Sequence, residues 1–512
     1  MGLDLVVRGG WVVDGAGGPR FRGDVGVRDG RIVQVGSLGG VEAAAVVEAG
    51  GRYVLPGFVD CHSHGDGVIF EKNVQLACLR QGVTSVLFGQ DGLSFAPVRQ
   101  KATFRYVRRY FAAINGGHPA VEGPVSVGEL LGGYDKAVAV NAGYLIPHGT
   151  VRFDVMGAAE RAADPEELAA MRGIVERGLS EGAVGISSGL EYAPGRYADA
   201  RELADICAAL NGRPYVTHMR GYGAQAGVGM AEVVEIARLS GAAMHVSHFH
   251  GPSADLLPLV ADARAQDVDL TFDTYPYLRG STILGMVVLP PWVPAADIEQ
   301  AIAVLAAEGE RVKREWAGVV WERLTLAHAP GFEWAEGLTL PEAAERHGTR
   351  VEEFCRLLLI ETRLEAGCVM TRPDEGPSGD ESMRAIMRDP GHTGGSDGIH
   401  VGGHPHPRAY GTFARYLGRH VRELGDLTWE QAAVHLASHP ARRFRLPDRG
   451  LIRPGQIADL IVVDPATVTD TATYQDPRSP ATGIDDVLVA GVPVLRDGRL
   501  TGATPGRALR AA

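Results

Sequence analysis

Histidines and aspartates recur at the ends of apolar runs that lie far apart in the chain. The first pair is His62 and His64, in the run VDCHSHGDG. Side chains two residues apart in an extended segment point to the same side, so this spacing can present two imidazoles to one cation. The pattern alone is also common on surfaces and in hydrogen-bonded cores, so the case for a metal depends on further residues.

Four more residues of ligand type each follow a separate apolar run: Asp91 in FGQDG, His218 in YVTHMR, His248 in HVSHFH and Asp397 in GGSDG. Taken singly, a histidine on a strand is more often a satisfied core residue, and an aspartate before glycine is more often a turn former. Six residues at matching positions favour one shared site for zinc or another first-row divalent ion. Such ligands would leave coordination positions open, which is typical of a catalytic metal site.

The elements that must position these residues are eight apolar runs alternating with helical stretches. The runs are YVLPGFVDCH, VTSVLFGQ, AVAVNAGYLIPH, AVGISSGL, PYVTHMR, AAMHVSHFH, DLTFDTYPY and HTGGSDG. Apolar residues between them recur at helical spacing, as in 164–182 and 231–241. The alternation predicts an α/β fold of the TIM type, a (β/α)8 barrel. At the carboxyl-side rim of such a barrel, one side chain from each of several strands can reach the same point.

Both ends of the chain read differently from its middle. Short alternating runs with Asp-Gly turns at 29–30 and 497–498 predict β-hairpins near each terminus. We expect a small β-sandwich domain assembled from 1–54 and 441–512, with the barrel in 55–440. Residues 283–390 exceed one crossover connection, so they predict an insertion at the catalytic face, either a lid or a structural embellishment.

Composition excludes several classes of protein. The chain has 512 residues, 45% of them hydrophobic, and a net charge of -12 with no basic stripe, which argues against nucleic-acid binding. No apolar stretch reaches the roughly 20 residues that span a bilayer, and the N-terminus lacks a secretory pattern. The five cysteines show no metal-type spacing and read as reduced thiols. A cytoplasmic protein without membrane contact is expected, and a homo-oligomer stays open.

With these residues in place, the chain resembles the D-aminoacylase (N-acyl-D-amino-acid deacylase) family of the amidohydrolase superfamily. The resemblance covers nearly the whole length and depends on runs such as PGFVDCHSHGD, GISSGLEYAPGRYAD, DTYPYLRGST and GGSDGIHVGGHPHPRAYGTF. It implies a metal-bearing barrel that hydrolyses a small-molecule N-acyl-D-amino acid. It also implies that His62 and His64 form the weaker of two metal sites and His218 and His248 the tighter one. Asp397 would be both the catalytic acid/base and a metal ligand.

Three positions depart from the pattern of the best-known members. Asp91 stands where those members carry a cysteine ligand, and a carboxylate is harder than a thiolate, so manganese or cobalt could replace zinc in a centre of one or two ions. His250 stands where a nearby lysine helps to hold the substrate carboxylate. Arg279 replaces a small residue and could take over part of that contact.

The expected chemistry is attack on an amide carbonyl by metal-activated water, with Asp397 moving the proton. Tyr192 and Tyr275 are candidate donors to the developing oxyanion, with plain packing as the alternative. The candidates for the substrate carboxylate are His250, Arg279, Ser281 and Arg408, although a surface ion pair would equally account for Arg408. His148 follows the third strand and is expected to orient a ligand or the substrate.

Two other functions remain open at this point. The same residues could serve another amidohydrolase, such as a dipeptidase or a cyclic-amide hydrolase. However, the chain has only four lysines and none of them ends a strand, which argues against a metal-bridging carboxylated lysine of the dihydropyrimidinase kind. The third possibility is a non-catalytic metal-binding protein. An acid/base residue beside an open coordination position argues against it, because only catalysis requires such a residue.

Overall fold

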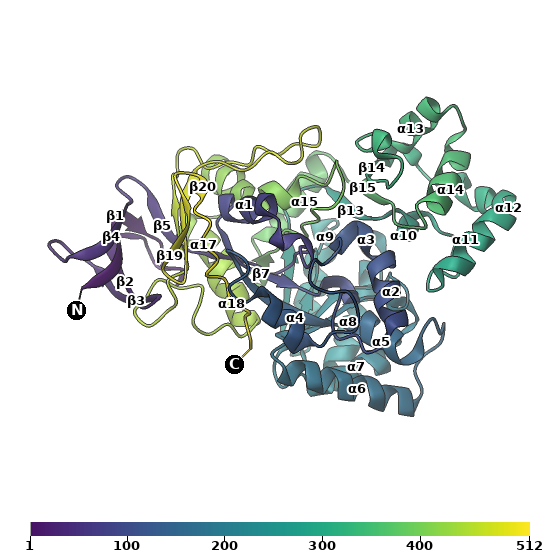
Figure 1. Cartoon of the computed structure of the whole chain (residues 1–512), viewed down its shortest axis with the longest axis horizontal. Coiled ribbons are helices and arrows are strands. Elements are labelled where there is room, and N and C mark those ends of the chain that lie inside the picture. The colour runs from purple at the N-terminus through teal and green to yellow at the C-terminus, as the bar shows by residue number, and fades with distance from the viewer. Residues whose placement is uncertain (1, 512) are drawn as a thin grey trace.

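A computed structural model describes residues 2–511, and a nine-stranded sheet formed by both ends of the chain occupies one side of it (Figure 1). Its strands are β1 (Leu3–Val12), β2 (Phe21–Arg28), β3 (Arg31–Gly36), β4 (Ala43–Glu48), β5 (Tyr53–Pro56), β17 (Leu460–Val463), β18 (Ile484–Val489), β19 (Val492–Arg496) and β20 (Arg499–Leu500). Strand β1 pairs with β4 along its first half and with β5 near its end, so the sheet branches there. Val7, Val25, Val54 and Leu460 fill a core shared by strands from both termini.

Eight parallel strands form the barrel, and each falls within one of the eight runs predicted from the sequence. They are β6 (Phe58–Asp60), β7 (Val83–Phe88), β8 (Asn141–Pro147), β9 (Gly185–Gly189), β10 (Pro214–His218), β11 (Ala243–Val246), β12 (Leu270–Thr274) and β16 (His392–Gly394). They pair in chain order from β6 to β16. The two edges meet beyond their strands, where Asp397 N donates to His62 O at 2.8 Å and His64 N donates to Gly398 O at 3.0 Å. The TIM-type prediction is confirmed.

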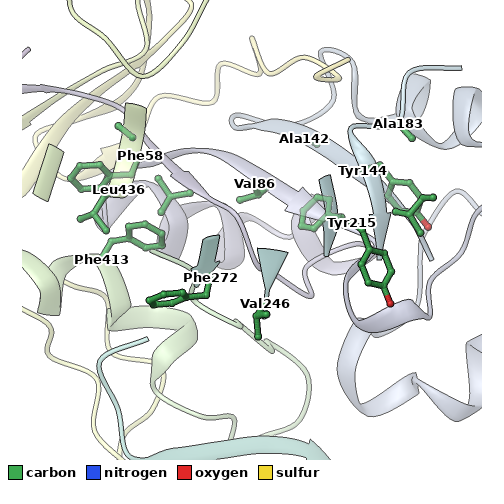
Figure 2. Packing of buried hydrophobic residues seen from close by; sticks show 14 of the residues in the cluster. Phe58, Val86, Ala142, Tyr144, Ala183, Tyr215, Val246, Phe272, Phe413 and Leu436 are labelled. Carbon is green, nitrogen blue, oxygen red and sulfur yellow. The ribbon is translucent and has the colours of Figure 1, made fainter. Parts of the chain in front are cut away.

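Helices surround these strands. They are α1 (Lys72–Arg80), α2 (Lys101–Tyr110), α3 (Ala112–Asn115), α4 (Val127–Tyr134), α5 (His148–Met156), α6 (Pro165–Ser180), α7 (Ala200–Cys207), α8 (Ala226–Ser240), α9 (Ser253–Ala265), α15 (Pro377–Met387), α16 (Arg408–Arg415), α17 (Trp429–Ala433) and α18 (His439–Arg443). Side chains on the outer strand faces, among them Val86, Val246 and Phe272, pack in the buried cluster of Figure 2. Burial of this apolar surface fixes the strands, and hence the loops that follow them.

Between β12 and β16 the chain leaves the barrel and builds a separate lobe, at the upper right of Figure 1. The lobe contains β13 (Arg279–Ile283), α10 (Leu284–Val288), α11 (Ile298–Ala307), α12 (Gly309–Glu315), β14 (Leu324–His328), α13 (Leu340–His347), α14 (Val351–Glu361) and β15 (Gly367–Thr371). Its antiparallel sheet has the order β13-β15-β14, and the lobe has its own apolar core. The sequence predicts an insert at about 283–390, whereas this sheet starts at Arg279 and α15 packs on the barrel helix α9.

The lobe is fastened to the carboxyl-side rim of the barrel. Glu336 accepts a hydrogen bond from Gly403 N at 2.6 Å, in the loop after β16. Tyr192, in the loop after β9, pairs through its hydroxyl with Thr282 of β13 at 2.8 Å. Among residues 2–511, no helix is long and apolar enough to cross a membrane.

Candidate metal centre

The six predicted ligands lie at or just beyond the carboxyl ends of five barrel strands. His62 and His64 follow β6, Asp91 follows β7, His218 ends β10, His248 follows β11 and Asp397 follows β16. Most of these strands stop two to four residues earlier than the sequence suggested, so short loops carry the side chains over the barrel mouth. Asp91, His248 and Asp397 have left-handed backbone φ angles of 52°, 35° and 48°. Such angles are uncommon outside glycine and are often found at functional sites.

The six side chains form two overlapping groups of buried ligand atoms. The atoms of His62, His64, Asp91 and Asp397 all lie within 4.8 Å of one another, and those of Asp91, His218 and His248 do so too. Asp91 belongs to both groups. The structure therefore brings together every residue that the sequence proposed as a ligand.

The Asp91 carboxylate lies between the two histidine pairs. Its Oδ1 is 3.6 Å from His62 Nε2, and its Oδ2 is 3.5 Å from His64 Nε2. Oδ2 is also 3.7 Å from both His218 Nδ1 and His248 Nε2. These separations exceed a hydrogen bond and leave room for a cation between the atoms. One carboxylate can thus serve both halves of the centre.

The donor atoms fit a divalent cation. His62 Nε2, Asp91 Oδ1 and His218 Nδ1 are buried and have no hydrogen-bond partner among the described residues. Burial opposes protonation of His64, but the nearby carboxylates of Asp397 and Asp91 raise its pKa to about 10. Burial likewise opposes protonation of His218, and Asp91 and Glu191 raise its pKa to about 10. The cluster therefore attracts positive charge, which a metal ion with imidazole and carboxylate ligands would supply.

Asp397 has two different environments for its two oxygens. Oδ1 lies 3.3 Å from His64 Nε2 and 3.6 Å from His62 Nε2, whereas Oδ2 pairs with Arg408 Nη2 at 2.8 Å. Burial alone would raise the pKa of Asp397, but the Arg408 guanidinium and the histidines lower it. Arg408 is fully buried and lies 4.5 Å above the Tyr275 ring, which excludes a surface ion pair.

The two predicted oxyanion donors differ in availability. The Tyr192 hydroxyl is engaged with Thr282 at 2.8 Å, and its ring packs against His218 at 5.0 Å between centroids. Tyr275 lines a small cavity beside His248, and its hydroxyl makes no hydrogen bond within residues 2–511. Tyr275 is therefore the freer donor.

Two of the residues predicted to contact the substrate lie outside the cluster of metal-ligand atoms. His148 Nε2 is 2.9 Å from Glu202, which also accepts from Arg152 Nε at 2.9 Å, so this histidine belongs to a buried network outside the cluster. Arg279 pairs with Glu375 at 2.6 Å and covers the Tyr474 ring at 4.1 Å. Residues that are close in space but distant along the chain hold both side chains, so these contacts could not be predicted from local sequence.

The other two predicted contacts remain near the barrel mouth. His250 lines the same cavity as His248, and its ring stacks on Tyr222 at 4.8 Å with Nδ1 directed at His248 O, 2.7 Å away. Ser281 accepts a hydrogen bond from Arg408 Nη2 at 3.3 Å through its backbone oxygen.

An arginine that the sequence analysis missed also lines this cavity. Arg372 follows β15, is 6% exposed, and its Nε has no hydrogen-bond partner within 2–511. The carboxylate of Asp374 lies 3.5 Å away, which is too long for a strong pair. The run GCVMTRP did not indicate that Arg372 lies near the site, because Arg372 reaches the barrel mouth only through the fold of the inserted lobe.

Three residues that contact the other ring nitrogens of the predicted histidine ligands were also not predicted from the sequence. His62 Nδ1 lies 3.3 Å from Asp273 Oδ2, His64 Nδ1 lies 3.3 Å from Asn115 Oδ1, and His218 Nε2 lies 2.8 Å from Glu191 Oε2. For Asp273 a signal was present, because it is a carboxylate at an inward-facing position of a predicted strand. Asn115 and Glu191 lie in helix and loop segments without a comparable pattern.

Comparison with known proteins places this fold and this site in one class. A profile of the Amidohydrolase family matches residues 45–256 and 291–495. The D-aminoacylase of Alcaligenes xylosoxydans xylosoxydans is 33% identical, with 99% of this chain and 97% of the relative covered. The N-acyl-D-glutamate deacylase of the same organism is 34% identical, with 99% and 96% covered.

A solved structure extends the match to three dimensions. The N-acyl-D-glutamate deacylase of Bordetella bronchiseptica, complexed with zinc and a phosphonate mimic of the tetrahedral intermediate, superposes with a TM-score of 0.84 at 31% identity. The superposition covers 100% of both chains. The protein is therefore an amidohydrolase. Within that class it belongs to the D-aminoacylase family, as its sequence motifs indicated.

Proposed function

We propose that this protein uses zinc to hydrolyse the amide bond of N-acyl-D-amino acids, releasing a carboxylate and a free D-amino acid. The observation that carries the proposal is the placement of Asp397, with one oxygen among the metal-ligand atoms and the other held by buried Arg408. The deacylases described above, which resemble this chain along its whole length, support the choice of substrate.

The residues that would hold zinc are His62, His64, Asp91, His218 and His248, with Asp397 at the open side. Bound there, the ion supplies Lewis acidity, which polarises a carbonyl and makes water more acidic. Asp91 would serve both histidine pairs. Its carboxylate is a hard ligand, so the centre would also admit manganese or cobalt.

Asp397 carries the proton. Its Oδ1 faces the cluster and accepts the proton of the attacking water, while Arg408 keeps Oδ2 engaged and the carboxylate ionised beforehand. When the carbon–nitrogen bond breaks, the same oxygen returns that proton to the departing amine. One aspartate thus serves as base and then as acid.

The substrate would be oriented by two side chains that line the small cavity beside His248, Tyr275 and Arg372. Tyr275 can donate its hydroxyl to the oxygen of the amide as negative charge develops there. Arg372 presents a buried guanidinium to the same cavity, and its planar fork matches a carboxylate. Because Asp374 comes only within 3.5 Å of Arg372, whereas Glu375 holds Arg279 at 2.6 Å, we assign Arg372, rather than Arg279, to the carboxylate of the amino acid.

The direct test is Asp397→Asn, which preserves shape but removes the base. Turnover of N-acetyl-D-amino acids should fall by about 100- to 10,000-fold, while zinc content by elemental analysis stays near the wild-type value. Asp262→Asn, on the exposed face of α9, is the matched control and should keep full turnover. Near-normal turnover by Asp397→Asn would remove this residue from the chemistry.

A further inference from the structure

We propose that Asp273 is a positioning residue that holds both histidine pairs of the metal centre at once, so that the two halves of the centre form together. The proposal builds on the metal-dependent function above, but concerns a residue that need not touch metal or substrate. Asp273 lies on β12, beneath the barrel mouth, and is completely buried.

The first link runs to the pair after β6. The Nδ1 of His62 lies 3.3 Å from Asp273 Oδ2. An ionised carboxylate only accepts hydrogen bonds, so Nδ1 carries the hydrogen and donates it. The lone pair of His62 then resides on Nε2, the buried atom that faces Asp91 and Asp397 without a hydrogen-bond partner. Asp273 thus fixes both the ring orientation and the tautomer that a metal ligand needs.

The second link runs to the other pair through the backbone. The amide of His248 donates to Asp273 Oδ1 at 2.9 Å. His248 adopts a left-handed φ of 35°, which a histidine does not favour without support. The two oxygens of one carboxylate therefore hold a side chain from one histidine pair and the main chain of the other.

Asp273 is itself held in place. His245 Nε2 lies 3.1 Å from Oδ2, and His245 Nδ1 lies 2.8 Å from the hydroxyl of Thr271. A Cβ added at Gly395 would come within 2.8 Å of Asp273 Oδ1 and 2.9 Å of the His62 Cβ. Glycine at 395 therefore lets β16 approach close enough to close the barrel over this carboxylate.

Two neighbouring contacts supply natural controls, because each serves one histidine only. Asn115 Oδ1 lies 3.3 Å from His64 Nδ1, and Glu191 Oε2 lies 2.8 Å from His218 Nε2. Asn115 thus supports the first pair alone and Glu191 the second pair alone. Among the three, Asp273 alone contacts both.

The experiment measures zinc binding, not turnover. Metal-free Asp273→Ser, Asn115→Ala and Glu191→Ala are titrated with zinc against a chromophoric chelator, and circular dichroism and the melting temperature report folding. We expect Asp273→Ser to weaken both successive zinc affinities by about 10- to 100-fold. Asn115→Ala and Glu191→Ala should each weaken one affinity and leave the other within about twofold.

If Asp273→Ser does not fold, Asp273→Asn replaces it. An amide has one acceptor oxygen, so at least one affinity must fall in that variant. The proposal is overturned if Asp273→Ser lowers only one affinity, or if either Asp273 variant keeps both. A wild-type protein that binds zinc but hydrolyses no N-acyl-D-amino acid would instead refute the proposed function and leave the role of Asp273 standing.

Discussion

At the scale of single residues, the metal centre consists of buried charged groups that stabilise one another. Asp91 is buried among four imidazoles, and Asp397 is shared between the cluster and Arg408. Burial would raise the pKa of Asp91, yet the surrounding histidines hold it well below its usual range. Such an arrangement costs stability unless the charges are matched, so its presence in one spot points to function.

Arg372 provides a prediction at the residue scale. Replacing it by Gln removes a charged hydrogen-bond donor worth about 1.5–3 kcal/mol, so KM for N-acyl-D-amino acids should rise by about 10- to 100-fold. The value of kcat should change much less, because Asp397 and the ligands stay in place. Steady-state kinetics measure both constants.

The matched control for Arg372→Gln is Arg279→Gln, since Glu375 and Tyr474 already hold that guanidinium. Its KM should stay within about threefold of the wild-type value. If the two variants exchange these effects, the carboxylate contact belongs to Arg279, as the sequence suggested.

At the scale of elements, the barrel strands bring the ligand residues to the carboxyl-side rim, and the loops after the strands orient their side chains. Most of the barrel strands were visible in the sequence because strands buried on both faces read as apolar runs, although β16 reads HTG and has no aliphatic residue. The limits of the inserted lobe were harder to find: β13 reads RGSTI, a mostly polar strand, and α15 belongs by packing to the barrel ring.

The anchoring of α15 gives a pH-dependent prediction. Burial alone would raise the pKa of Asp426, but hydrogen bonds from Arg384, His420 and Arg388 lower it to about 2. The unfolded value is about 3.9, so the stabilisation is fully present above that pH and disappears as pH falls toward 2. Asp426→Asn should lower the free energy of unfolding at pH 7, and the deficit should shrink below pH 4.

Urea unfolding of wild type and Asp426→Asn at pH 7, 4 and 3 measures this deficit. Asp262→Asn, which removes an exposed carboxylate that forms no ion pair within residues 2–511, should show no deficit at any of these pH values. A deficit for Asp426→Asn that is equal at pH 7 and pH 3 would contradict the assigned ion pairs.

At the scale of the whole molecule, the sequence predicted what local pattern determines and missed what tertiary contact determines. The clustering of His62, His64, Asp91, His218, His248 and Asp397 could be predicted because residue type and strand ends are both visible in local sequence. Arg372 and Glu191 were missed, and His148 and Arg279 were given roles near the substrate, because their partners come from distant segments. The barrel is thus predictable in outline, whereas its outer contacts require the folded chain.

The most direct test of the central claim is hydrolysis by the protein after its metal has been removed and restored. Dialysis against a chelator should abolish turnover of N-acetyl-D-amino acids while circular dichroism shows the barrel intact. Adding zinc should restore that turnover, with little activity on the L-enantiomers. Full activity in protein that elemental analysis shows to be free of metal would contradict the account.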